Sequence, residues 1–131
     1  MNKRRLLKLA DLLEADARTK NGIRFDYWNF GEVSNPKKPL SCGTEACALG
    51  LAALSGEFKD GGLDYELDEY GFIKFLMKGR RLGPFAAAAK VFGITYNQAG
   101  TLFSPQVRDK VKGAEAERDV AKKIRTFVAA G

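Results

Sequence analysis

Apolar residues recur with the period of an α-helix at both ends of this chain of 131 residues, and this pattern most constrains its fold. One stripe runs from Asn2 to about Thr19, and the other from about Ala114 to Ala130. Both patterns are typical of helices that bury one face in a core. The stripes consist of Leu6, Leu9, Ala10, Leu13 and Ala17 in the first helix, and of Ala116, Val120, Ile124, Phe127 and Val128 in the last.

Three further helices are predicted between these two. The first runs from about Thr44 to Leu54 and is rich in alanine and glycine. The second begins at Pro84, because proline is accepted in a first helical turn, and Gly93 closes it. The third begins with a capping box of Thr95 and Gln98, and it continues to residue 103.

The strand signal is confined to one segment, where Leu63, Tyr65 and Leu67 alternate with acidic residues. It predicts a small β-hairpin near residues 63–76. Because chains usually divide into domains only above ~250 residues, we expect a single domain over residues 1–131. The predicted fold class is mainly α, or α+β at most: one compact helical domain of about five helices with the hairpin inserted.

The segment between the first two helices is predicted to be a loop pinned by its aromatic side chains. It follows Asn21-Gly22, a pair suited to a left-handed helix cap. A loop with this many large apolar side chains is expected to bury them in the core. The side chains concerned are Phe25, Tyr27, Trp28 and Phe30.

The chain contains no histidine, and this absence excludes several kinds of chemistry. Ser-His-Asp and Cys-His catalysis, imidazole acid–base chemistry and histidine zinc sites all need that residue. The two cysteines alone are too few for a structural zinc site. We therefore expect no enzymatic activity, no catalytic residue, no metal and no cofactor.

The longest apolar run, Ala46 to Leu54, is far shorter than the ~20 residues of a membrane span. The basic, leucine-rich start superficially resembles a signal peptide, but Lys8, Asp11 and Glu14 interrupt its apolar part. The sequence thus favours an amphipathic helix, no membrane contact and a cytoplasmic location.

The net charge is +6, from 22 basic and 16 acidic residues. Such a balance favours association with nucleic acid or acidic proteins, although solvated faces with ordinary ion pairs are an equal alternative. Asp64, Glu66 and Asp68 would share one strand face, a spacing that oxygen-ligated cations accept. A solvated edge strand protected by charge is the favoured interpretation of these three.

The segment 42–47 is interpreted as structural. Gly43 makes a tight turn, Thr44 caps the following helix, and Cys47 faces the core. Cys42 precedes the helix and is expected to be partly exposed. The spacing of the two cysteines differs from that of a redox pair. Because a reducing cell keeps thiols reduced, both are expected to stay free.

Residues 86–103 match the pattern of a helix-turn-helix, with Gly93 in the turn. In a DNA-binding protein the second helix would present base-reading side chains, while basic residues would contact phosphates. Two short helices packed across a glycine turn give the same pattern without DNA binding. The candidate nucleic-acid-binding residues are Arg4, Arg5, Lys90, Tyr96, Asn97, Gln98 and Thr101.

The order of segments FDYWNFGE, SCGTEACALGLAA and LGPFAAAAKVFGITYNQAGTLFSP, followed by an amphipathic helix, resembles a set of small uncharacterised phage and prophage proteins. Those proteins carry a C-G-T-x-A-C-x-x-G segment and a later F-G-[LI]-T-x-x-x-A-x-x-L-F segment. The resemblance implies a mobile-element context and no catalytic residues.

The leading hypothesis is a non-enzymatic phage-type or mobile-element-type accessory protein that binds a macromolecular partner. The partner would be a host or phage protein, for example a defence-system protein, and an anti-CRISPR-like inhibitor is one version. The alternative is a DNA-binding protein that uses the helix-turn-helix-like segment at 86–103.

Overall fold

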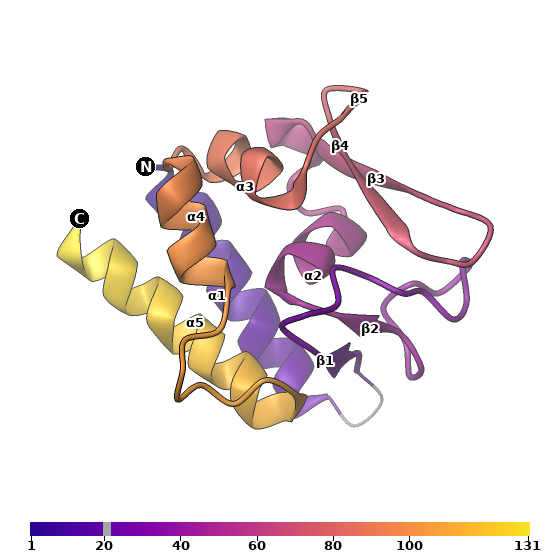
Figure 1. The fold of residues 1–131 in the computed structure, drawn as a ribbon, viewed down its shortest axis with the longest axis horizontal. Helices are drawn as coiled ribbons and strands as arrows, with labels where there is room; N and C mark the ends of the chain where they lie inside the picture. Colours follow the sequence, from indigo (N-terminus) through magenta and orange to yellow (C-terminus); the bar gives the residue numbers. More distant parts are fainter. Residues whose placement is uncertain (20–21) are drawn as a thin grey trace.

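The computed structural model describes residues 1–19 and 22–131 (Figure 1). Over these ranges the chain forms five α-helices and five short strands, so the fold is a mixed α+β one in which helices predominate. The helices are α1 (Lys3–Arg18), α2 (Ala48–Ser55), α3 (Pro84–Phe92), α4 (Tyr96–Phe103) and α5 (Gly113–Ala130). The strands are β1 (Arg24–Phe25), β2 (Glu45–Ala46), β3 (Leu63–Leu67), β4 (Ile73–Met77) and β5 (Arg80–Arg81), and a 3-10 turn, η1 (Lys59–Gly61), precedes β3.

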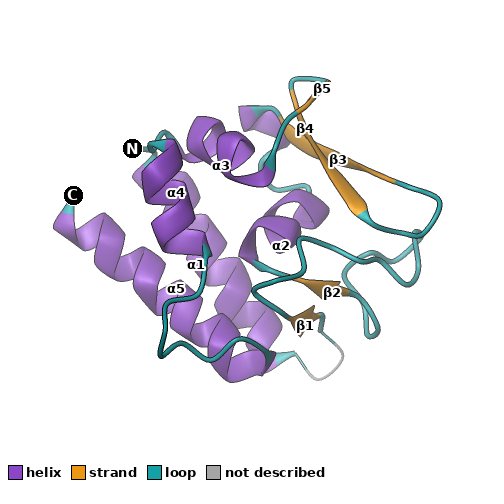
Figure 2. Ribbon diagram, in the orientation of Figure 1, coloured by secondary structure: helices purple, strands orange, loops and turns teal. Residues whose placement is uncertain are grey.

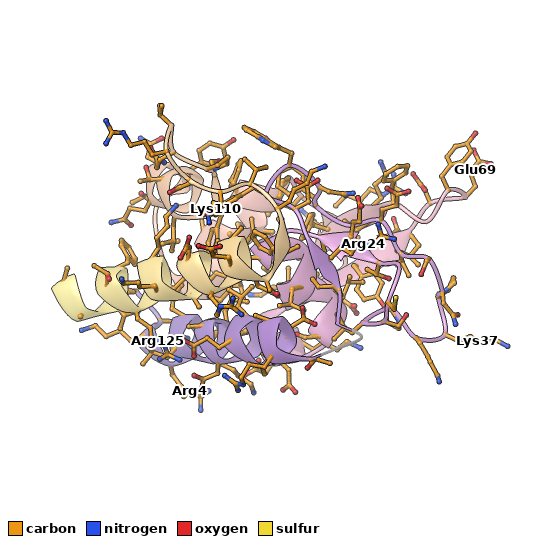
Figure 3. The ribbon with its side chains drawn as sticks, turned by 90° about the horizontal axis from the view of Figure 1, so that it is seen from below. Arg4, Arg24, Lys37, Glu69, Lys110 and Arg125 are labelled. Atoms are coloured by element: carbon orange, nitrogen blue, oxygen red, sulfur yellow. The ribbon has the colours of Figure 1, made fainter. Side chains whose placement is uncertain are left out.

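The terminal helices α1 and α5 lie side by side and antiparallel (Figures 1 and 3). Their facing sides carry most of the apolar stripes predicted from the sequence, so burial of these stripes holds the pair together. The fully buried members are Leu6, Leu9, Ala10 and Leu13 from α1, and Ala116, Val120 and Ile124 from α5. Helix α1 ends at Arg18, and Asn21 of the predicted left-handed cap lies outside the described residues.

Helix α2 lies between this helix pair and the three-stranded sheet (Figure 2). Every residue from Ala48 to Leu54 is buried, as expected for a helix that is apolar on all sides. Gly50 lets α2 pack closely against the backbone at Phe30, since a Cβ atom at Gly50 would stand only 2.0 Å from the carbonyl oxygen of Phe30.

Two small sheets accompany the helices (Figure 2). Strands β3 and β4 pair antiparallel, with Leu63 opposite Met77, and β5 adds to the other edge of β4. Strands β1 and β2 form a separate parallel pair, with Arg24 opposite Glu45. The sequence did not predict this second pair, because two-residue strands carry no measurable alternation.

The predicted helix start at Thr44 is wrong. Helix α2 begins at Ala48, and the residues before it pair with β1 in strand β2. Thr44 is fully buried, and its hydroxyl oxygen accepts a hydrogen bond from the Ser34 N–H (3.4 Å) instead of capping a helix. The backbone of this segment is already paired, as in the bond from the Cys47 N–H to the Asn29 carbonyl (2.6 Å).

The aromatic loop is only partly as predicted. Phe25 and Tyr27 are buried in the core, where their rings meet edge to face, and Phe30 is partly buried. Trp28, in contrast, is 69% exposed, so its predicted role in filling the core is wrong. Asp26 turns the chain at this point, because its carboxylate accepts a hydrogen bond from the Trp28 N–H (2.9 Å).

The helical pair α3–α4 has the predicted boundaries. Pro84 stands in the first turn of α3, and Gly93 ends that helix in the left-handed conformation with φ +64°. The predicted capping box is confirmed. The Thr95 hydroxyl accepts the Gln98 N–H (3.0 Å), while the Gln98 carboxamide oxygen accepts the Thr95 N–H (2.9 Å).

Candidate functional site

Two exposed aromatic side chains, Trp28 and Phe72, line a groove of about 610 Å³, which we call the aromatic groove. Trp28, the only tryptophan of the chain, lines one side, and Phe72, 43% exposed, lines another. Gly31 and Ile73 also line it, and they approach each other closely because Gly31 has no side chain. The groove therefore joins two exposed aromatic rings to the edge of the core.

Hydrogen bonds from backbone N–H groups fix both sides of the aromatic groove. On one side, the Asn29 side chain accepts the Gly31 N–H (3.0 Å). On the other side, one carboxylate oxygen of Asp68 accepts the N–H groups of Tyr70 (2.8 Å) and Phe72 (3.0 Å). A further bond from the Ile73 N–H to the Gly31 carbonyl (2.9 Å) ties the two sides together. The exposed rings are thus carried on well-fixed turns.

The charged residues that line the aromatic groove are Asp26, Asp68 and Lys74. Asp26 also forms a long ion pair with Lys112, with 3.8 Å between the two charged groups. Two carboxylates beside an exposed indole ring favour a basic group, since the face of an aromatic ring attracts cations.

A second groove, of about 560 Å³, lies between α4 and α5, and we call it the helical groove. Leu102 and Phe127 supply its apolar part, and Lys122, Lys123 and Thr126 line it from α5. Three predicted nucleic-acid-binding residues, Asn97, Gln98 and Thr101, line it from α4 and are exposed. The capping box fixes the orientation of the Gln98 side chain, because its carboxamide oxygen accepts the Thr95 N–H.

The other predicted nucleic-acid-binding residues lie elsewhere. Tyr96 is 61% exposed at the start of α4, with its ring packed edge to face against Phe85. Arg5 and Lys90 line a separate cavity. Arg4 points to the side of the molecule opposite the loop that carries Lys110 (Figure 3). The structure therefore distributes the predicted set over more than one surface.

The 42–47 segment has the thiol arrangement predicted from the sequence. Cys42 is exposed, Cys47 is buried, and both are free. Gly43 turns the chain with φ +98°. Burial raises the pKa of the Cys47 thiol to about 11, so that it stays protonated and unreactive at neutral pH.

The acidic residues of β3 and the turn after it pair locally. Within residues 1–19 and 22–131, no cluster of three or more possible ligands is placed to hold a metal ion. Glu66 pairs instead with Arg81 across the sheet (2.7 Å), and an Asp64 oxygen accepts the Tyr65 N–H. Over the same ranges, none of the helices combines the length and the apolar character that crossing a membrane requires.

No protein-family model, curated protein or solved structure matches this chain. The candidate site therefore rests on the geometry of the surface. Sequence reasoning missed Trp28 and Phe72 as site residues, because aromatic residues in a loop are typical of core contacts as well as of binding surfaces. No spacing in the sequence separates these two outcomes.

Proposed function

We propose that this protein is a non-enzymatic binding protein and that the aromatic groove receives a segment of another protein. The occupant is a segment that presents an apolar side chain next to an arginine or lysine. The observation that carries the proposal is the exposure of Trp28 and Phe72 on either side of a groove with fixed walls.

Exposed aromatic rings are costly to keep in water, and they are enriched where proteins meet. Tryptophan is among the residues that most often dominate the binding free energy of an interface. Trp28 can stack on an arginine or lysine side chain of the partner, and Asp68 lies at the same groove to pair with that charge. The groove thus offers both apolar and electrostatic recognition.

The resemblance to phage and prophage proteins supports an accessory role in a bacterial host cell, with a host or phage protein as the partner. A protein of this kind acts by covering a surface that its partner needs, and this requires no catalytic group. Inhibition of a defence-system protein is one version of the proposal, and it places the protein in the host cytoplasm.

The proposal is tested by capturing proteins from a bacterial host lysate on the immobilised wild type, Trp28→Ala and Tyr70→Ala. Tyr70 is the matched control, because it is 73% exposed on the same turn as Phe72 but does not line the groove. We expect a partner that the wild type and Tyr70→Ala retain and that Trp28→Ala binds at least tenfold more weakly. Its affinity is then measured with the purified partner.

Two outcomes contradict this proposal. One is a partner that binds wild type and Trp28→Ala with equal affinity. The other is that only nucleic acid is retained above background.

The alternative function is DNA binding through α4. It is favoured by the exposure of Tyr96, Asn97, Gln98 and Thr101 on one short helix after a glycine turn. Asparagine and glutamine suit the edge of adenine in the major groove. The phosphate contacts would then come from basic residues such as Lys122, which lines the same helical groove.

DNA binding is distinguished from protein binding by its dependence on salt, because each phosphate contact releases counterions. We would measure binding of the wild type and of an Asn97→Ala, Thr101→Ala double variant to a selected duplex over a salt series. A steep salt dependence, together with loss of sequence preference in the variant, supports the alternative. Unchanged preference in the variant contradicts it.

A further inference from the structure

Four basic side chains from different parts of the chain line one cavity of about 630 Å³, which we call the basic cavity. They are Arg5 from α1, Lys78 from the turn between β4 and β5, Arg80 from β5 and Lys90 from α3. Asp60 is the one acidic residue that lines it. The basic cavity and the aromatic groove lie at opposite ends of β4. Met77, the last residue of β4, lines the basic cavity, whereas Ile73 and Lys74, the first two, line the aromatic groove.

The guanidinium group of Arg5 is held in a fixed position at this cavity. One of its nitrogens donates to the carbonyl oxygen of Val91 (3.0 Å), and another lies 3.7 Å from the carboxylate of Asp60. Gly61 makes room for the group, because a Cβ atom there would stand 2.8 Å from the guanidinium carbon. A cation fixed in advance loses little conformational freedom when it binds a ligand.

Lys78 is held at the cavity in an unusual backbone conformation. It is the only residue other than glycine with a positive φ (+53°) within the described ranges. With Gly79 it forms the two-residue turn between β4 and β5, a position where asparagine is preferred over lysine. The Lys78 stem packs where a Cβ atom of Gly62 would stand, 2.8 Å from Lys78 Cγ. A residue kept in a conformation that disfavours it points to a role of its side chain.

The basic side chains are largely without acidic partners. In the part of the chain that the structure describes, Lys78, Arg80 and Lys90 form no ion pair. Asp60 forms an ion pair there with Arg5 and with no other residue. Like charges that converge on one cavity repel each other, and an anion with several negative charges removes that repulsion. The volume is within the range of cavities that hold small molecules.

We propose that the basic cavity binds the phosphate groups of a small phosphorylated molecule, such as a nucleoside diphosphate or triphosphate. Arg5 supplies a fixed positive charge, because its guanidinium group is already held in place by Val91 and Asp60. The exposed side chains of Lys78, Arg80 and Lys90 bind the remaining phosphate oxygens. This site is separate from the aromatic groove, so it would let a phosphorylated ligand bind without displacing a protein partner.

The test is calorimetric titration of the full chain with pyrophosphate, a nucleoside triphosphate and a short single-stranded oligonucleotide. We expect saturable binding of pyrophosphate and the triphosphate at near-physiological salt. Lys78→Asn should weaken this binding about tenfold, the effect of losing one charged hydrogen bond. The same change suits the left-handed turn, so that the variant should fold at least as well as the wild type.

Lys37→Asn is the matched control, because it removes the same charge from an exposed lysine at the far end of the molecule (Figure 3). It should leave the affinity for pyrophosphate unchanged. The proposal is overturned if neither phosphate probe binds, or if Lys37→Asn weakens binding as much as Lys78→Asn. It is also overturned if only the oligonucleotide binds, since this result assigns the charge to a nucleic-acid surface.

Discussion

The carboxyl groups of Glu117 on α5 and Asp16 on α1 lie next to each other inside the contact between the two terminal helices. Glu117 is only 1% exposed. Burial, followed by the hydrogen bond and the charge of Asp16, raises the pKa of Glu117 from 4.5 to about 10. Glu117 therefore stays protonated at neutral pH, which avoids a second negative charge beside Asp16.

The raised pKa of Glu117 makes the stability of the fold depend on pH. Since the pKa of Glu117 is higher in the folded than in the unfolded chain, its contribution is complete below pH 4.5 and is lost as the pH rises toward about 10. Glu117→Gln keeps a hydrogen-bond donor that does not ionise. At pH 9 we expect this variant to be more stable than the wild type by about 1–3 kcal/mol, and its stability to vary less with pH, as measured by urea unfolding.

Glu115→Gln provides the control, because Glu115 is exposed on the same helix and pairs with Lys110. It should leave the alkaline part of the stability curve unchanged. A wild-type curve that is flat between pH 5 and about pH 9 would show that Glu117 is ionised in the folded protein.

Arg125 makes a second contact between the same helices at their surface. Its guanidinium group donates to Asp11 (2.5 Å) and to both carboxylate oxygens of Glu14 (2.6 and 3.2 Å), and Figure 3 shows its position beside α1. These contacts lower the pKa of Glu14, so their contribution is present above pH 4.5 and is lost as the pH falls.

Arg125→Gln should reduce the free energy of unfolding by about 1 kcal/mol at neutral pH, a modest value because the pair is partly exposed to solvent. The difference from the wild type should shrink in high salt, which screens surface charges. Chemical unfolding at low and high salt measures both effects. Equal losses at the two salt concentrations would mean that Arg125 acts through packing of its stem.

Gly50 and Gly100 both lie inside helices but should respond oppositely to alanine. Gly50→Ala places a methyl group against the Phe30 carbonyl and should destabilise the fold by about 1–3 kcal/mol. A Cβ atom at Gly100 on α4 would have no atom within 4 Å apart from its chain neighbours and the nearby backbone of its own helix. Gly100→Ala should therefore stabilise the fold by about 0.5–1 kcal/mol. Thermal unfolding of the two variants checks this pair, and destabilisation by both would refute the packing argument.

The helices could be predicted from the sequence because their signals are local. The capping box of Thr95 and Gln98 and the glycine end at Gly93 involve neighbouring residues, and both are as predicted. The start of α2 could not be predicted, because the backbone of β2 finds its partners in β1 and near Asn29, which lie far away in the sequence. Long-range pairing overrode the local helix signal at Thr44.

The candidate site was less predictable than the fold. The sequence indicated the exposed α4 residues, but it did not reveal that Asn97 shares a groove with Thr126 of α5. Trp28 was expected in the core, and its exposure depends on the turn that Asp26 makes. Burial of Glu117 was also missed, since a glutamate next to an apolar stripe is normally solvated.

The two cysteines should differ sharply in reactivity. Cys42 is exposed, whereas Cys47 is buried with a pKa of about 11, so a thiol reagent at neutral pH should modify Cys42 alone in the folded protein. Mass spectrometry of the digested protein locates the label, and Cys47 should react only after unfolding. Modification of both thiols at similar rates would show that α2 opens readily.

Replacing each cysteine by serine should reduce stability at the buried position and not at the exposed one. Cys47→Ser places a hydroxyl group in the core and should destabilise the fold by about 1–3 kcal/mol, whereas Cys42→Ser should change stability by less than about 0.5 kcal/mol. Both variants are compared by urea unfolding and by binding of the captured partner. Because neither thiol lines the aromatic groove, both variants should bind the partner as the wild type does under conditions where they are folded. A serine variant that keeps full stability but no longer binds the partner would instead indicate a functional, reactive thiol.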